Sequence, residues 1–207
     1  MYGQPAKESV ESIPVGIQEN VLLDHIAYEP AKKEGDSAKV FAFYFKDEAG
    51  RLFRHLEWEV DRERAKATAQ SYGKDPLTYA DEQETRVSER VYHILSNFVP
   101  MAKLTQVTGS SFGTWCEAVV KALGEANKGV KLRLKLVYNN ADYVSLPRVT
   151  WNGGFCQKMD FASTLRLTQY DRVEKKQQDD LSGLTANVTA DATNGKVTPA
   201  KELEWDN

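Results

Sequence analysis

Three stretches in the first 60 residues alternate between apolar and polar positions, and this is the period of a β-strand. They cover residues 15–28, 39–45 and 51–60. In the second stretch, three aromatic side chains share one face: Phe41, Phe43 and Phe45. The segment Asp47-Glu48-Ala49-Gly50 is typical of the turn between two paired strands, so the second and third stretches are predicted to form a hairpin.

The third stretch, RLFRHLEWEV, has one face that is mostly apolar and one that is mostly polar. The apolar face holds Leu52, Leu56, Trp58 and Val60, together with Arg54. Because alternate side chains of a strand point to opposite sides, this set is expected to enter the core. The opposite face, which is expected to be more accessible, holds Phe53, His55, Glu57 and Glu59.

The period then changes to that of amphipathic helices. Asp61 is a suitable N-cap for a short helix that ends at Gly73, and residues 81–98 predict a second helix. A third helix is expected to begin after Ser110 or Ser111. Two more strands are predicted at 131–138 and 143–149, and residues 161–170 fit either a further strand or a short helix.

Three strands, a helical insertion at about residues 61–127 and two more strands follow the order of an OB-fold. This five-stranded Greek-key barrel binds oligonucleotides and oligosaccharides. The sequence therefore predicts a mainly β protein with an OB-fold-like domain over residues 15–176, after a flexible segment at 1–14. Residues 177–207 are rich in Thr, Ala, Asn and Gly without core-forming periodicity, so they predict a disordered acidic tail.

The 207 residues carry a net charge of -3, but the charge is unevenly distributed. Residues 100–176 hold twelve Lys and Arg against six Asp and Glu, whereas residues 177–207 hold six acidic residues against two lysines. No apolar run approaches the roughly 18 residues that span a membrane, and there is no apolar signal segment at the N-terminus. We therefore expect a cytoplasmic protein without membrane contact. Cys116 and Cys156 lack metal-ligand spacing and are expected to be free thiols.

A basic segment and two aromatic groups are the candidate binding residues. Lys131, Arg133 and Lys135 are two positions apart, so on a strand they project from one face and suit a phosphate backbone. The alternative is an exposed sheet edge that is protected by charge. Aromatic side chains on an OB-fold surface stack with bases, and Tyr44, Phe53 and His55 are candidates unless the helical insertion buries them. The hairpin between the last two strands adds Tyr143, Arg148 and Trp151.

The chain resembles the phage-encoded single-stranded DNA-binding proteins that are built on an OB-fold. Three segments carry the resemblance: PVGIQENVLLDHIAYEP, VFAFYFKDEAGRLFRHLEWEV and VKLRLKLVYNNADYVSLPRV. An acidic C-terminus with an aromatic residue, KELEWDN, is also similar, although it does not end on that residue. The resemblance implies a protein that coats and protects single strands during phage DNA replication or recombination, without sequence specificity, in the cytoplasm of an infected bacterium.

In such proteins the tail recruits replication or recombination partners. Here that role would fall to Glu202, Leu203, Glu204, Trp205 and Asp206. The tail would alternatively compete with DNA for the basic face, or simply keep the protein soluble. The resemblance implies no cofactor and leaves oligomerisation open.

Sequence motifs of hydrolases, metalloenzymes and P-loop NTPases are absent, and His25, His55 and His93 are scattered over separate elements. We therefore expect a binding protein rather than an enzyme, with no metal site. Two alternatives remain at this point. One is a structural or adaptor protein of a virion or replication complex, and the other is a DNA-processing enzyme whose catalytic residues are dispersed along the chain.

Overall fold

The computed structural model describes residues 11–31, 38–148 and 154–175, all within one compact unit that ends at Lys175. Its strands are β1 (Gly16–Pro30), β2 (Lys39–Lys46), β3 (Leu52–Trp58), β4 (Lys131–Tyr138), β5 (Val144–Ser145) and β6 (Cys156–Lys158). Its helices are α1 (Arg62–Ser71), α2 (Pro76–Leu95), α3 (Met101–Leu104) and α4 (Phe112–Leu123). None of the helices in this described part is long and apolar enough to cross a membrane.

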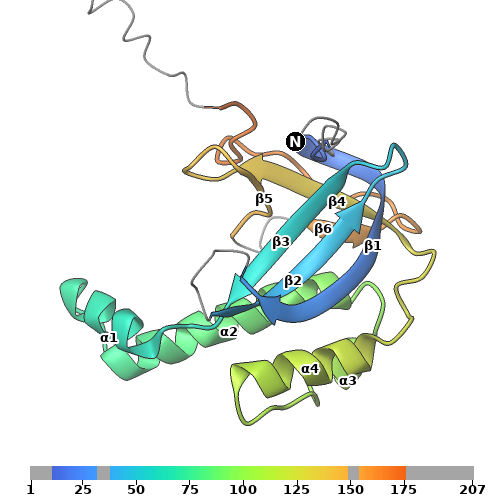
Figure 1. The fold of residues 1–207 in the computed structure, drawn as a ribbon. Helices are drawn as coiled ribbons and strands as arrows, with labels where there is room; N and C mark the ends of the chain where they lie inside the picture. The colour runs from blue at the N-terminus through green and yellow to red at the C-terminus, as the bar shows by residue number, and fades with distance from the viewer. Residues whose placement is uncertain (1–10, 32–37, 149–153, 176–207) are drawn as a thin grey trace, which may run out of the picture. The chain divides into compact units, whose positions relative to one another are not determined.

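The strands form one antiparallel sheet in the order β3-β2-β1-β4-β5, and β6 also pairs with β4 (Figure 1). The predicted closed barrel is not observed, because β3 and β5 are the two ends of the sheet and no described pairing joins them. The mainly β architecture with a helical insertion between β3 and β4 is confirmed. The described part of the predicted flexible N-terminus is ordered, since Ile13 is buried and its N–H donates to the Leu52 carbonyl.

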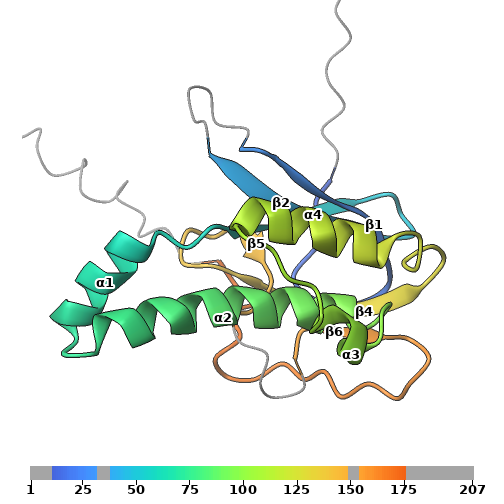
Figure 2. The same cartoon turned by 90° about the horizontal axis from the view of Figure 1, so that it is seen from below.

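The core lies between one face of the sheet and the helices α2 and α4, which run across that face (Figure 2). The sheet contributes Phe41, Phe43 and Phe45, all fully buried. The helices contribute apolar side chains at helical spacing: Val91, Ile94, Leu95, Val119 and Leu123. Helix α4 begins at a capping box, in which Ser111 and Thr114 satisfy each other's backbone N–H groups.

The predicted orientation of β3 is wrong. Phe53 is 5% exposed and Glu57 is 3% exposed, whereas Leu52 and Trp58 are 43% and 47% exposed. The pairing with β2 explains this reversal, because Phe53 lies opposite Phe45, and Glu57 lies opposite Phe41. Side chains that face each other in a pair of strands share one side of the sheet, so the phenylalanines of β2 determine which face of β3 enters the core.

The C-terminal part of the described chain also differs from the prediction. Residues 161–170 form neither a strand nor a helix, and β5 is two residues long. Residues 158–175, which we call the C-terminal strap, instead lie over β4 through hydrogen bonds to Arg133, Lys135 and Tyr138. The predicted tail and Val149 lie outside the described residues.

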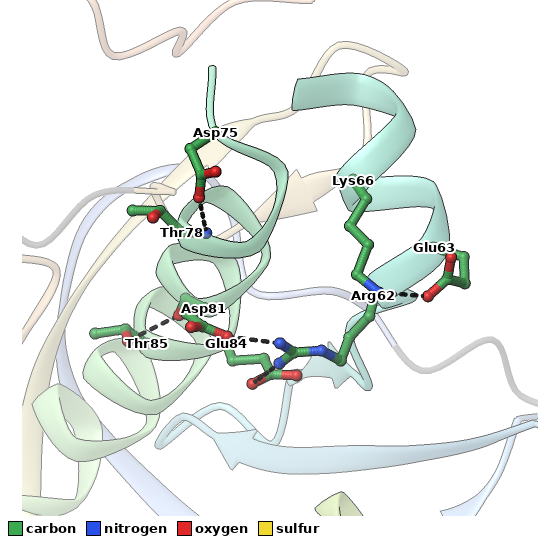
Figure 3. A network of polar contacts seen from close by, with 8 residues as sticks. All are labelled: Arg62, Glu63, Lys66, Asp75, Thr78, Asp81, Glu84 and Thr85. Carbon is green, nitrogen blue, oxygen red and sulfur yellow. Dashed lines mark hydrogen bonds and ion pairs between the residues drawn. The ribbon is translucent and has the colours of Figure 1, made fainter. Parts of the chain in front are cut away.

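Helices α1 and α2 form a hairpin that is fastened by exposed charges. Figure 3 shows Arg62 of α1 reaching two carboxylates of α2, with distances of 2.6 Å to Asp81 and 2.7 Å to Glu84. The N-cap of α2 is Asp75, which accepts a hydrogen bond from the Thr78 N–H. Exposed pairs of this kind contribute little stability individually, so the hairpin depends more on Ala65, Ala69 and Ala80, which are buried in it.

Side chains of α2 hold β6 in place. His93 Nε2 accepts hydrogen bonds from the N–H groups of Phe155 at 3.1 Å and Cys156 at 3.3 Å. Gly154 makes this approach possible, because it has a φ of +75° and a Cβ there would lie 2.2 Å from His93 Cε1. Burial lowers the pKa of His93, so this imidazole is neutral and acts as an acceptor near neutral pH.

We expect the protein to lose stability as the pH falls below about 6.5, the usual His pKa. Protonated His93 would have two N–H donors and could not accept from β6. Because the pKa is lower in the folded state, the unfolded chain binds the proton first, and the stabilisation is complete only above the unfolded value. Urea unfolding at pH 7.5 and 5.5 should show a larger loss for the natural protein than for His93→Gln, which does not titrate. Equal losses in both proteins would contradict this role.

Candidate nucleic-acid interface

The three cations of β4 share one face, but each one is paired within the protein. Lys131 Nζ lies 2.7 Å from Glu48, and Arg133 Nε lies 2.8 Å from Glu19. Arg133 also donates to the Phe161 carbonyl at 2.6 Å. These contacts leave little of the strand free to follow a phosphate backbone.

Lys135 is the clearest departure from the expected binding face, because it is only 3% exposed. Its Nζ lies 3.1 Å from Asp171 Oδ2 and 3.2 Å from the Arg166 carbonyl. Burial alone would raise the pKa of Asp171, but hydrogen bonds from the Thr168 N–H and from Lys135 outweigh it and hold the pKa below its usual range. Lys135 therefore anchors the C-terminal strap, and its expected exposure on a binding face is wrong.

The three aromatic candidates on β2 and β3 do not form one platform. Phe53 is buried, with its ring centroid 5.9 Å from that of Phe45, so its expected exposure as a stacking surface is wrong. His55 lies on the same face and its Nε2 is 2.9 Å from Glu57. Tyr44 lies on the opposite face, where it stacks on His25 at 4.2 Å between ring centroids.

A groove runs along the outer edge of β3, between this strand and the β4–β5 hairpin. It consists of two hollows, of about 460 Å³ and 580 Å³, which share Phe53, Arg54 and Val144 as lining residues. The N-terminal segment pairs with β3 at Leu52, and beyond that point no described strand pairs with this edge. We call the two hollows together the β3 groove.

The lining of the β3 groove is positively charged on balance. Its ionised side chains are four cations, Arg54, Arg90, Arg148 and Lys175, and two carboxylates, Glu57 and Asp142. Arg54 is paired with Glu29 and Arg90 with Glu57. Arg148 and Lys175 are exposed and form no ion pair with any described residue. Two accessible aromatic rings also line it, Trp58 at 47% and Tyr143 at 71% exposed.

A buried polar cluster forms one wall of this groove. The guanidinium of Arg90 binds Glu57 with two hydrogen bonds, from Nε to Oε1 at 2.6 Å and from Nη2 to Oε2 at 2.5 Å. Burial would raise the pKa of Glu57, but the bonds from Arg90 and His55 outweigh it and lower the pKa. The carboxylate is therefore ionised at neutral pH and fully occupied by its partners.

The structure thus brings together Phe53, His55, Tyr143 and Arg148 from the predicted set, with Phe53 buried, and it separates them from Tyr44 and the β4 cations. Trp151 and the tail residues 202–206 lie outside the described residues. Sequence reasoning missed Trp58, Arg54, Gln83, Arg90 and Lys175. Trp58 was detectable as the aromatic residue on the face opposite Phe53, but the others come from elements whose positions depend on the tertiary fold.

A further hollow lies at the start of α4, where a helix N-terminus would favour an anion. Its lining includes Glu59 and Glu84, and Ser111 already caps the helix. Negative charge at this position disfavours a phosphate. Across the described residues, no group of histidine, cysteine, aspartate and glutamate side chains is arranged to hold a metal ion, and both cysteines are buried free thiols.

Comparisons with known proteins give no match: no family model fits the chain, and no curated protein or solved structure is significantly similar to it.

Proposed function

We propose that this protein binds single-stranded DNA without sequence specificity, along the β3 groove. The observation that carries the proposal is the combination, in one groove, of a cationic lining with the exposed rings of Trp58 and Tyr143. Cations attract the phosphate backbone, and aromatic rings stack on any base. These are the two components of sequence-tolerant binding to single strands.

The strand order supports the proposal. We interpret β3-β2-β1-β4-β5, with helices between β3 and β4, as an OB-fold whose barrel is open between β3 and β5. OB-folds bind their ligands with the second and third strands and with two loops, one of which joins the fourth and fifth strands. The β3 groove lies between β3 and this loop, which carries Tyr143.

In this proposal the protein is not an enzyme. It coats strands exposed in phage replication or recombination, in the cytoplasm of an infected bacterial cell. The acidic residues around Trp205 would then recruit other replication proteins.

The test is fluorescence anisotropy with labelled oligo-dT at about 50 and 200 mM salt, beside duplex DNA of the same length. We expect tight binding of the single strand, weaker binding at the higher salt concentration because counterions are released, and little binding of the duplex. Tyr143→Ala should weaken oligo-dT binding by roughly 5- to 150-fold, the range that one stacked base provides. Absence of oligo-dT binding at low salt, also after deletion of residues 177–207, would exclude the proposed function.

A second candidate is an adaptor that binds other proteins. The C-terminal strap favours it by exposing four large apolar side chains, Phe161, Leu167, Tyr170 and Val173. In that case deletion or substitution of these residues would abolish a protein contact and leave oligo-dT binding unchanged.

A further inference from the structure

A β-bulge in β1 turns an imidazole to the face of the sheet that is directed away from α2 and α4, which we call the outer face. Leu23 and Ile26 are both buried in the core, although residues three positions apart in a regular strand point to opposite sides. The register shift between Leu23 and His25 explains this, because a bulge inserts one extra residue. As a result, His25 lies opposite Tyr44 of β2 on the outer face.

A buried side chain holds the bulge in its conformation. Asn127, which follows α4 and is 6% exposed, donates from Nδ2 to the carbonyls of Leu23 at 2.7 Å and Asp24 at 3.0 Å. Buried polar groups are normally satisfied in this way, and bulges often re-aim a side chain beside a functional site. The position of His25 on the outer face is therefore determined by the fold.

The imidazole of His25 is held on two sides and open on a third. Its ring stacks on that of Tyr44, with 4.2 Å between the centroids and 14° between the planes. Its Nδ1 lies 2.6 Å from Asp24 Oδ2, yet its side chain remains 53% exposed. Because Tyr44 covers one face and Asp24 contacts an edge, the accessible face of the ring is the one directed away from Tyr44.

Tyr44 connects this ring to the β3 groove. Its hydroxyl donates to Glu29 Oε1 at 2.5 Å, and the guanidinium carbon of Arg54 lies 5.5 Å from its ring centroid. Arg54 also donates to Glu29 and is one of the lining residues of the β3 groove. Since Arg54 is the pairing partner of Tyr44, and Tyr44 that of His25, the three side chains form a continuous row across β3, β2 and β1.

We propose that His25 is a stacking platform for one base of the bound single strand, which leaves the β3 groove at Arg54 and crosses the outer face to β1. This inference rests on the proposed function and extends the binding path beyond the groove. Imidazole is among the rings on which unpaired bases stack. A ring that is already fixed loses little conformational freedom when a base covers it.

The surrounding charges indicate that the contact is made by a base and not by a phosphate. The carboxylates of Asp24 and Glu29 lie on either side of the stacked rings, in contact with His25 and Tyr44 respectively. Negative charge at these positions disfavours a phosphate group next to the imidazole, whereas a neutral base can still stack. An abasic strand of equal length, which keeps only the sugar-phosphate backbone, therefore separates the two contacts.

The informative pair of variants is His25→Ala, which removes the ring, and His25→Phe, which keeps a ring without its nitrogens. We expect His25→Ala to weaken oligo-dT binding by roughly fivefold, the lower end of the range for one stacked base, and to leave binding of the abasic strand unchanged. His25→Phe should retain close to natural affinity for both strands. The matched control is Tyr72→Ala, which removes a 71% exposed ring at the C-terminus of α1 and should change neither affinity.

Anisotropy at about 50 mM salt measures these affinities, because low salt keeps binding of the abasic strand detectable. An unchanged affinity of His25→Ala for oligo-dT would overturn the platform and leave the proposed function standing. An equal loss on both strands would also overturn it, since the contact would then be with the backbone. Failure of His25→Phe to bind better than His25→Ala would show that the nitrogens matter and stacking does not. If the natural protein binds neither strand, both the platform and the proposed function are wrong.

Discussion

Replacement of Arg90 by leucine should lower the free energy of unfolding by about 3–5 kcal/mol, the usual result of removing one partner of a buried ion pair. Glu57 is 3% exposed, and Arg90 provides both of its charge-assisted bonds from α2. Without the guanidinium, the carboxylate would remain buried beside His55 alone. Urea unfolding at pH 7 measures the loss.

Two further variants separate this effect from a general loss of packing. The double substitution Glu57→Leu with Arg90→Leu removes both charges and should recover much of the stability, because buried pairs are often replaceable by apolar residues. Arg86→Leu is the matched control on the same helix, since its ion pair with Glu82 is exposed and 3.8 Å long. A loss for Arg90→Leu as small as that for Arg86→Leu would show that the Glu57 pair is not important for folding.

The sequence pattern predicted the strands well wherever alternation is strong. Residues 15–28 and 131–138 correspond closely to β1 and β4, which are Gly16–Pro30 and Lys131–Tyr138. The period of two is a local property, so it can be read without knowing the fold. It does not determine which face is buried. For β3, the face with more apolar side chains was expected to be buried, and this was the wrong face. Pairing with Phe41 and Phe45 decided that question, and register between strands is a tertiary property.

Sequence patterns were a poorer guide to the candidate site than to the strands. The spacing of the β4 cations correctly placed Lys131, Arg133 and Lys135 on one face, because they alternate along a continuous strand. It could not reveal that Glu19, Glu48 and Asp171 would neutralise them. Those acidic residues lie 36 to 114 positions away and follow no period. The basic composition of residues 100–176 therefore stabilises the fold in part and is not wholly available for binding.

This division of the cations has a measurable consequence for DNA binding. Lys135→Met should lower the free energy of unfolding by about 3 kcal/mol, because it leaves Asp171 largely buried without its cation. The protein that remains folded should bind oligo-dT with nearly natural affinity, since Lys135 does not reach the surface. Chemical unfolding and anisotropy on the same preparation measure the two quantities.

The double variant Arg148→Ala with Lys175→Ala should behave in the opposite way, because both side chains are exposed in the β3 groove. We expect an unchanged unfolding midpoint and a weaker salt dependence of binding. Each lost phosphate contact reduces the slope of log K against log salt by about 0.7 on single strands, so two contacts reduce it by about 1.4. The control is Lys103→Ala with Lys121→Ala, an equal change in charge at exposed positions of the helical layer. If this control reduces the slope as much as the groove variant does, the attraction arises from the overall charge of the protein and the β3 groove is not the path of the strand.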